Sequence, residues 1–184
     1  MIITEFLPIG QFDKYGDWLK NQNDETKELY FGVAGSDHVI DSLMDRIRTF
    51  CTDHWILVAK DKNKWVGTLH IAVNNNTVEF GLIVDPAYRG QGIASIMLDE
   101  ALVWAKNRGY RELFMHCLGW NKPIQHLCHK HGLKPHNIYG DSEVQIKLGL
   151  PSWMTIAKEI GIAQRNIFHK FLQSNPFLYQ EIHG

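Results

Sequence analysis

The sequence predicts an α+β fold, in which helices flank a mixed, mostly antiparallel sheet and a helical extension follows at the C-terminus. Three observations lead to this prediction. Residues 55–84 contain β-rich segments separated by short polar turns. Residues 37–50 and 92–109 repeat apolar side chains at helical spacing. Residues 150–184 are too apolar to form a free linker.

The first part of the chain predicts one strand and two helices. A strand is expected at residues 2–8 and a helix at residues 12–20, before a polar break that begins at Asn21. Ser36 is a suitable N-cap for a second helix at residues 37–50, where apolar side chains form one face. Two helices therefore lie between the first strand and the next.

Three consecutive strands are expected at residues 55–60, 65–73 and 77–84. Their short polar turns predict an antiparallel meander. After these strands, helices and strands alternate. The expected order is a helix at 92–109, a strand at 113–117, a helix at 121–131 and a strand at 143–148. This order corresponds to a mixed sheet.

One domain is expected at residues 1–149, with a helical extension at 150–184. The apolar side chains of the extension predict that it docks on the domain or on a second subunit, as in a homodimer. Around Gly161 the extension weakly resembles a helix-turn-helix. One alternative function for the chain is therefore that of a DNA-binding regulator. The extension is too short for a three-helix module and is not strongly basic, so no nucleic-acid partner is expected.

Composition excludes several classes of protein. Hydrophobic residues make up 45% and charged residues 21%, which excludes a disordered chain, a collagen-like chain and a coiled coil. The net charge of −1 gives no support for a membrane or nucleic-acid surface, and no apolar run is long enough to span a membrane. The chain begins without the features of a secretory signal. Three scattered cysteines favour a reducing compartment, so a cytoplasmic location is expected.

Residues 79–94 carry the strongest chemical signal. A strand runs into a loop that contains Gly90 and Gly92, and the loop opens the long helix. Glycine lets a ligand approach the backbone closely, and the first amides of a helix attract an anion. A P-loop is excluded because its Gly-Lys-Ser/Thr sequence is absent. A dinucleotide fingerprint is excluded for two reasons. Ser95 replaces its third glycine, and the next strand ends in Cys117 where the fingerprint requires an acidic residue that binds the ribose.

The segment Arg89–Ala94 matches the [RQ]-x-x-G-x-[GA] motif of the GNAT superfamily of N-acetyltransferases, and the chain resembles this superfamily. The lead-in from Val84 to Tyr88 and the later pattern from Asn121 to Leu133 are also similar to the family's. The order of elements agrees over residues 2–148. The resemblance implies a GNAT-like fold and acetyl-CoA as cosubstrate, without a metal.

The resemblance also implies how acetyl-CoA binds. The main chain of the strand before the motif would pair with the pantetheine arm, and the motif amides would hold the pyrophosphate. That strand would separate from residues 113–117 to admit the arm, and Asn121 would bond the arm from the opposite side. The expected cosubstrate-binding residues are Leu82, Ile83, Val84, Arg89, Gly90, Gln91, Gly92, Ile93, Ala94, Ser95 and Asn121.

Two catalytic residues are expected. An amine must lose a proton to attack a thioester, and an ordinary lysine-like ammonium has a pKa of about 10.4. Glu79 stands where many GNAT members place a carboxylate base, and neighbouring Gly81 on the same face would leave room for the acyl group. The alternative is a solvated glutamate at the end of a strand.

Cys128 occupies the position of the family's usual tyrosine, which protonates the departing thiolate. Cys128 is therefore the expected acid. The alternatives are Tyr139, departure of the thiolate without help, and a cysteine that is simply buried in the helix.

The expected function is the transfer of an acetyl group from acetyl-CoA to a primary amine by direct attack, on a small molecule or a peptide. The alternative is a non-catalytic protein that binds or senses acyl-CoA, which the missing tyrosine favours. Acidic residues between Glu5 and Glu28 mildly favour a cationic acceptor. The chain has ten histidines, several of them between His116 and His136, but no zinc-ligand spacing is complete and no metal is expected.

Overall fold

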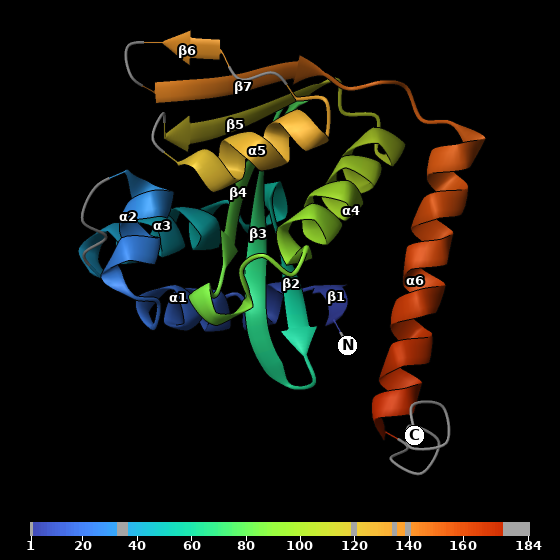
Figure 1. Cartoon of the computed structure of the whole chain (residues 1–184), viewed down its shortest axis with the longest axis horizontal. Helices are drawn as coiled ribbons and strands as arrows, with labels where there is room; N and C mark the ends of the chain where they lie inside the picture. The colour runs from blue at the N-terminus through green and yellow to red at the C-terminus, as the bar shows by residue number, and fades with distance from the viewer. Residues whose placement is uncertain (1, 33–36, 119–120, 134–135, 139–140, 175–184) are drawn as a thin grey trace.

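A computed structural model of the chain describes residues 2–32, 37–118, 121–133, 136–138 and 141–174. These residues form a seven-stranded sheet in the order β1-β2-β3-β4-β5-β7-β6, flanked by helices (Figure 1). The strands are β1 (Ile2–Phe6), β2 (His54–Asp61), β3 (Lys64–Asn74), β4 (Thr77–Val84), β5 (Glu112–Leu118), β6 (His136–Ile138) and β7 (Asp141–Lys147). The helices are α1 (Asp13–Lys20), α2 (Asp24–Phe31), α3 (Asp37–Thr49), α4 (Ile93–Asn107), α5 (Lys122–Lys130) and α6 (Trp153–Ser174).

The predicted fold class is confirmed. Neighbouring strands are antiparallel except β4 and β5, which are parallel. Each element expected before residue 149 is present, and its ends differ from the expected ones by no more than two residues. The expected N-cap, Ser36, lies outside the described residues.

Two elements were missed in the sequence. The strand β6 has three residues, too few to show an alternating pattern. The helix α2 occupies the expected polar break. Its apolar residues are consecutive (Leu29, Tyr30 and Phe31) and therefore lack helical spacing. Its ends do carry signals, because Asn23 accepts a hydrogen bond from the Thr26 amide at 2.9 Å and Gly32 adopts a left-handed φ of 73°.

The sheet separates two apolar cores. On one face, Met97, Leu98 and Trp104 of α4 pack on the sheet, and on the other face Leu19 of α1 and Ile47 of α3 do so. Adjacent residues of a strand serve different cores, as the alternation of side chains in a strand requires. Both cores fix the position of β4, which runs through the centre of the sheet (Figure 1).

The helix α6 docks on its own domain, along α4 and the edge strand β1. The Asn166 side chain pairs with the backbone of Thr4, donating to its carbonyl at 2.7 Å and accepting from its amide at 3.4 Å. The side-chain amide of Asn166 therefore supplies hydrogen-bond partners to backbone groups on an edge of β1 that has no neighbouring strand in the described part of the chain. The Thr4 hydroxyl also donates to the buried carboxyl of Glu100 in α4, and Glu159 of α6 pairs with Arg108 at 2.9 Å.

The opposite face of α6 is apolar and exposed. It carries Trp153, Met154, Ile156, Ile160, Ile167, Phe168 and Phe171. The homodimer expected from this extension stays a prediction. Among the described helices, none is long and apolar enough to cross a membrane.

We predict that Asn166→Ala lowers the free energy of unfolding by about 1–3 kcal/mol, because buried backbone groups of Thr4 lose their partners. Chemical denaturation measures this loss. Gln164→Ala, at an exposed position of the same helix, is the matched control. Equal stability of the two variants would show that the edge of β1 does not depend on Asn166.

Candidate active site

The sheet opens between β4 and β5. The two strands pair only where residues 77–79 face residues 112–114. Beyond this point, within the described part of the chain, β4 pairs only with β3 and β5 only with β7. Figure 1 shows the two groups of strands running in different directions. One backbone edge of β4, from Phe80 to Val84, is therefore left without a strand neighbour.

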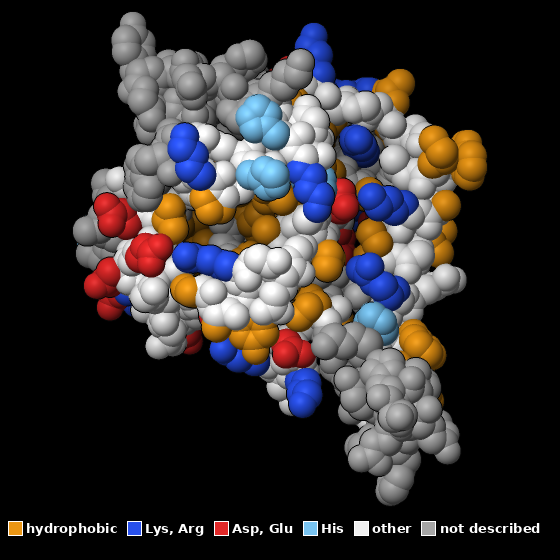
Figure 2. All heavy atoms as spheres, viewed as in Figure 1, with side chains coloured by type: hydrophobic (Ala, Val, Ile, Leu, Met, Phe, Trp, Pro, Cys, Tyr) orange, Lys and Arg blue, Asp and Glu red, His pale blue; other side chains and the backbone are white. Residues whose placement is uncertain are grey.

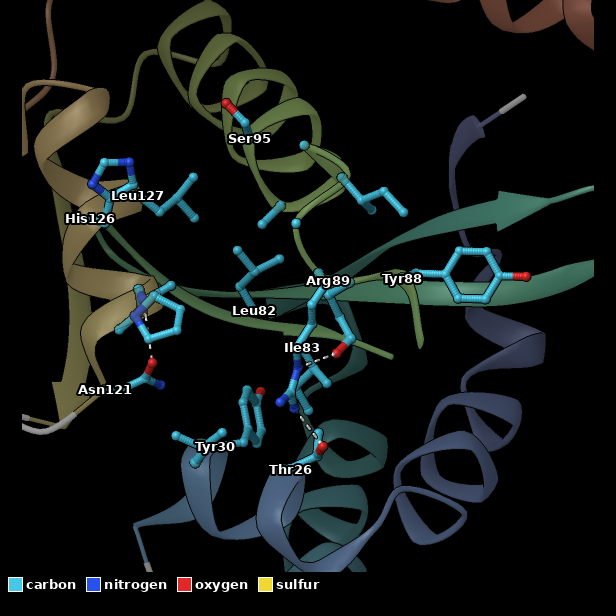
Figure 3. A pocket seen from close by; sticks show the side chains of 18 of the residues that line it. Thr26, Tyr30, Leu82, Ile83, Tyr88, Arg89, Ser95, Asn121, His126 and Leu127 are labelled. Atoms are coloured by element: carbon cyan, nitrogen blue, oxygen red, sulfur yellow. Dashed lines mark hydrogen bonds between the residues drawn. The ribbon is translucent and has the colours of Figure 1, made fainter. Parts of the chain in front are cut away.

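A cavity of about 470 Å³ adjoins this open edge (Figure 3). Leu82, Ile83 and Val84 of β4 form one wall, and α2, α5 and the start of α4 form the others. We call it the cosubstrate cavity, after the ligand that the sequence predicts for this strand edge. Figure 2 shows apolar side chains inside a hollow on this face, bordered by Lys, Arg and His side chains. Such a lining suits an extended ligand with an apolar arm and charged groups at its rim.

The loop before α4 presents backbone amides at one end of the cosubstrate cavity. Gly90 and Gly92 have φ values of 76° and 79°, and a Cβ atom on either would meet open space. The first intrahelical bond joins the Ile96 amide to the Gly92 carbonyl at 3.1 Å. The amides of residues 93–95 precede this bond, so they are free of helical partners and attract an anion.

The Arg89 side chain lines this cavity and holds the loop against α2. Its guanidinium donates to the Thr26 hydroxyl at 2.7 Å (Figure 3). It also lies 3.6 Å from the Glu25 carboxylate. The Arg89 backbone amide donates to the Pro86 carbonyl at 3.4 Å, so the free amides of the loop follow it. The Gln91 side chain likewise turns back to the Ala87 carbonyl, at 3.4 Å.

Asn121 lies on the wall opposite β4. Its Oδ1 caps α5 by accepting from the Ile124 amide at 3.3 Å (Figure 3). Its Nδ2 makes no hydrogen bond to another residue that the structure describes. This NH₂ group can therefore donate to a ligand in the cavity.

A second cavity of about 270 Å³ adjoins the first and contains Glu79 and Arg46. We call it the acceptor cavity, after the amine acceptor that the sequence predicts. Leu29, Tyr30, Leu82, Asn121 and Ile124 line both cavities, so the two meet at these side chains. Glu79 is exposed and forms no ion pair with any other described residue, which leaves its carboxylate available to a ligand.

Tyr30 corrects the expected role of Gly81. A Cβ atom at position 81 would overlap the phenol of Tyr30, so the space beside Gly81 holds this ring rather than an acyl group. The Tyr30 hydroxyl lies 3.2 Å from that of Tyr15. Burial raises the pKa of Tyr30 to about 12, and the nearby Glu79 carboxylate also raises it. The phenol therefore keeps its proton at neutral pH. Sequence reasoning missed Tyr30 because it missed α2.

Cys128 does not fit the role expected of it. It lies on α5, but its side chain is fully buried in the core and lines neither cavity. A thiol in that place cannot reach a group bound in either cavity. The alternative, Tyr139, lies outside the described residues.

Two buried histidines lie beneath the acceptor cavity. His70 lines it, and its Nε2 is 3.0 Å from Nδ1 of His54. Burial, followed by the charges of His54 and Arg46, lowers the pKa of His70 to about 3. His70 is therefore uncharged at neutral pH and a poor proton acceptor. The described residues contain no group of three or more His, Cys, Asp or Glu side chains able to hold a metal ion.

Comparison with known proteins gives a family match. The model of the acetyltransferase (GNAT) family matches residues 17–133. A curated relative, the putative phosphinothricin acetyltransferase YwnH of Bacillus subtilis (strain 168), is 45% identical over 58 residues. That match covers 32% of this chain and spans 36% of the relative's length.

Solved structures share the fold. The GNAT domain of S. lividans PAT has a TM-score of 0.66 at 16% identity, covering 79% of this chain and 89% of its own. Spermidine N-acetyltransferase from Vibrio cholerae, solved with CoA and spermine, has a TM-score of 0.62 at 17% identity, covering 80% and 95%. PaiA N-acetyltransferase from Thermoplasma acidophilum, solved with coenzyme A, has a TM-score of 0.62 at 19% identity, covering 80% and 99%.

We predict that Gly92→Glu lowers the affinity for coenzyme A by at least about 100-fold, because a carboxylate beside the helix amides repels phosphate. Isothermal titration calorimetry measures the affinity. Gly109→Glu is the matched control, since Gly109 also has a left-handed φ, of 81°, and open space around it. Unchanged affinity in a folded Gly92→Glu variant would remove the anion site from this loop.

Proposed function

Because the chain belongs to the acetyltransferase (GNAT) family, we propose that it transfers the acetyl group of acetyl-CoA to a primary amine by direct attack. The observation that carries this proposal is the open edge of β4, which faces a cavity ending at the free amides of α4. A pantetheine arm contains two amide groups and is followed by a pyrophosphate. It therefore complements a strand edge that leads to an anion site.

The proposed binding mode follows the walls of the cosubstrate cavity. The arm pairs with the backbone of residues 82–84, and the Nδ2 group of Asn121 donates to it from the opposite wall. The pyrophosphate meets the amides of residues 90–95. The thioester then lies toward the start of β4, where the two cavities meet. An amide N–H on the open edge of β4 stabilises the negative charge on the thioester oxygen.

Glu79 is proposed as the base. The amine nitrogen attacks the thioester carbon, and its proton passes to the Glu79 carboxylate directly or through a water molecule. Loss of the carbon–sulfur bond releases coenzyme A as its thiolate. Glu79 lines the acceptor cavity, and neutral His70 offers no competing base there.

Tyr30 is proposed in place of Cys128 as the partner of the departing thiolate. Tyr30 lines both cavities, and its hydroxyl lies beside Gly81 of β4. With a pKa of about 12, the phenol is a weaker acid than an ordinary thiol, whose pKa is about 8.5. Tyr30 therefore donates a hydrogen bond to the sulfur and keeps its proton, and the thiolate is protonated by solvent.

The acceptor cavity supports a compact amine that also carries an acidic group. The acidic residues of the N-terminal part do not line this cavity; Glu5 pairs with Lys60 and Lys170, and Asp13 pairs with Arg48. Arg46 does line it, opposite in charge to Glu79, and forms no ion pair with another described residue. We therefore propose an acceptor with one ammonium and one acidic group, used in a cytoplasmic setting without nucleic acid or membrane.

A screen of small amines with acetyl-CoA and detection of free thiol tests the proposed function. The account predicts release of coenzyme A only when an acceptor is present. A protein that binds or senses acyl-CoA without catalysis would bind it equally well and release no thiol with any amine.

We predict that Glu79→Gln lowers turnover at neutral pH by roughly 10²–10⁴-fold and leaves acetyl-CoA affinity unchanged, because glutamine cannot accept the proton. Activity should recover partly in alkaline buffer, where free amine is abundant. Glu28→Gln, at an exposed position of α2 outside both cavities, is the control. Near-normal neutral turnover of the Glu79 variant on the true acceptor would assign the base to another group.

We predict that Arg46→Gln raises KM for an acidic amine by roughly 10–100-fold, the loss of a charge-assisted contact of about 1.5–3 kcal/mol. The KM for the neutral amide of the same amine should change little. Arg48→Gln, on the same helix but paired with Asp13, is the control. Equal effects on both acceptors would contradict a role for Arg46 in recognising the acidic group.

A further inference from the structure

Ser95, His131 and Asp99 form a hydrogen-bonded chain beside the phosphate end of the cosubstrate cavity. The Ser95 hydroxyl lies 2.8 Å from Nε2 of His131, and Nδ1 of His131 lies 3.1 Å from an oxygen of Asp99. Ser95 and Asp99 lie one turn apart on α4, and His131 caps the end of α5. The His131 side chain is only 9% exposed, so packing holds these three hydrogen-bonded side chains in place.

Asp99 determines which nitrogen of His131 carries the proton. A carboxylate only accepts hydrogen bonds, so Nδ1 of His131 donates to Asp99. In the uncharged imidazole, Nε2 must then accept the proton of the Ser95 hydroxyl. Ser95 therefore presents only lone pairs to the cavity, and these repel a phosphate oxygen.

Protonation of His131 reverses the polarity of this chain. Both ring nitrogens of the charged imidazole donate, so Nε2–H donates to the Ser95 oxygen. The Ser95 hydroxyl is then free to donate its own proton into the cavity. A phosphate bound there gains one hydrogen bond and a nearby positive charge, and both favour the protonated form of His131.

Serine hydrolases use the same three residue types to activate a serine nucleophile. The position of Ser95 argues against that role here. Ser95 follows the end of β4, whereas Glu79 lies near its start, and the five residue steps from Glu79 to Val84 span about 17 Å. The proposed thioester lies near Glu79, out of reach of Ser95, while the phosphate-binding amides are adjacent to Ser95 in sequence.

We propose that His131 is a positioning residue that couples coenzyme A binding to proton uptake, by turning the Ser95 hydroxyl toward a phosphate group. This inference rests on the proposed function, because it takes coenzyme A as the ligand. Among the described residues, the structure places Asp99 of α4 and Lys158 of α6 at this group, and Lys130 directly precedes His131 in the sequence. Lys158 lies 3.8 Å from the same Asp99 oxygen, so α6 shares the carboxylate that His131 uses.

The sign of the pH effect follows from linkage. Bound phosphate favours the charged form of His131, so coenzyme A binding and protonation of His131 strengthen each other. The affinity for coenzyme A therefore falls as rising pH removes this proton. Where His131 is uncharged in the free protein, binding takes up to about one proton from solution.

Calorimetry in buffers with different ionisation enthalpies counts these protons, for coenzyme A and for the wild-type, His131→Gln and Ser95→Ala proteins between pH 6 and 8. Protons that coenzyme A itself exchanges are common to all three. We expect the wild-type protein to take up as much as about one proton more than either variant. In His131→Gln, the glutamine keeps an amide donor near Ser95 but cannot take up a proton. Ser95→Ala keeps His131 but removes the hydroxyl that connects it to the phosphate.

Dephospho-coenzyme A identifies the phosphate. The extra proton should disappear with this ligand if Ser95 faces the 3′-phosphate and persist if it faces the pyrophosphate. Equal proton counts for the wild-type protein and His131→Gln, with coenzyme A bound to both, would overturn the inference and leave the proposed function intact. Full uptake in Ser95→Ala would also overturn it. Failure of the wild-type protein to bind coenzyme A would contradict the proposed function itself.

Discussion

The unpaired edge of β4 is the constraint on which the rest of the site depends. Backbone amides and carbonyls inside a sheet need partners, and residues 80–84 have none on the β5 side among the described strands. The sheet tolerates the gap because each diverging strand keeps an antiparallel neighbour, β3 for β4 and β7 for β5. Water or an extended ligand must satisfy the open edge, which makes it a site for a strand-like molecule.

The two ends of this edge differ in charge and in the groups that they present. The amides of α4 attract an anion at one end, and Glu79 stands near the other. The helix α2 links them, because Thr26 holds the Arg89 side chain while Tyr30 packs on Gly81. Glu159 of α6 accepts hydrogen bonds from Asn107 and Arg108 at the C-terminal end of α4 and so helps to fix this helix. Cosubstrate binding and acceptor binding are therefore positioned by the same few helices.

Local patterns predicted the sheet, most helices and the anion-binding loop, because periodicity and glycine placement act over a few residues. Contacts between distant segments were not predictable in this way. Tyr30 fills the space at Gly81 from a helix whose apolar residues lack periodicity, although Asn23 and Gly32 mark its ends. Cys128 was assigned from a family position alone, and its burial depends on how α5 packs. The pairing of Ser95 with His131 joins two helices and is equally invisible in sequence.

Residue-resolved amide hydrogen exchange of β4, with and without coenzyme A, tests the central claim most directly. Adenosine 3′,5′-bisphosphate, which lacks the pantetheine arm, is the control ligand. The account predicts that amides of residues 80–84 on the open edge exchange rapidly in the free protein, slow markedly with coenzyme A and stay rapid with the control. Rapid exchange of all these amides at saturating coenzyme A would contradict the pairing of the arm with β4.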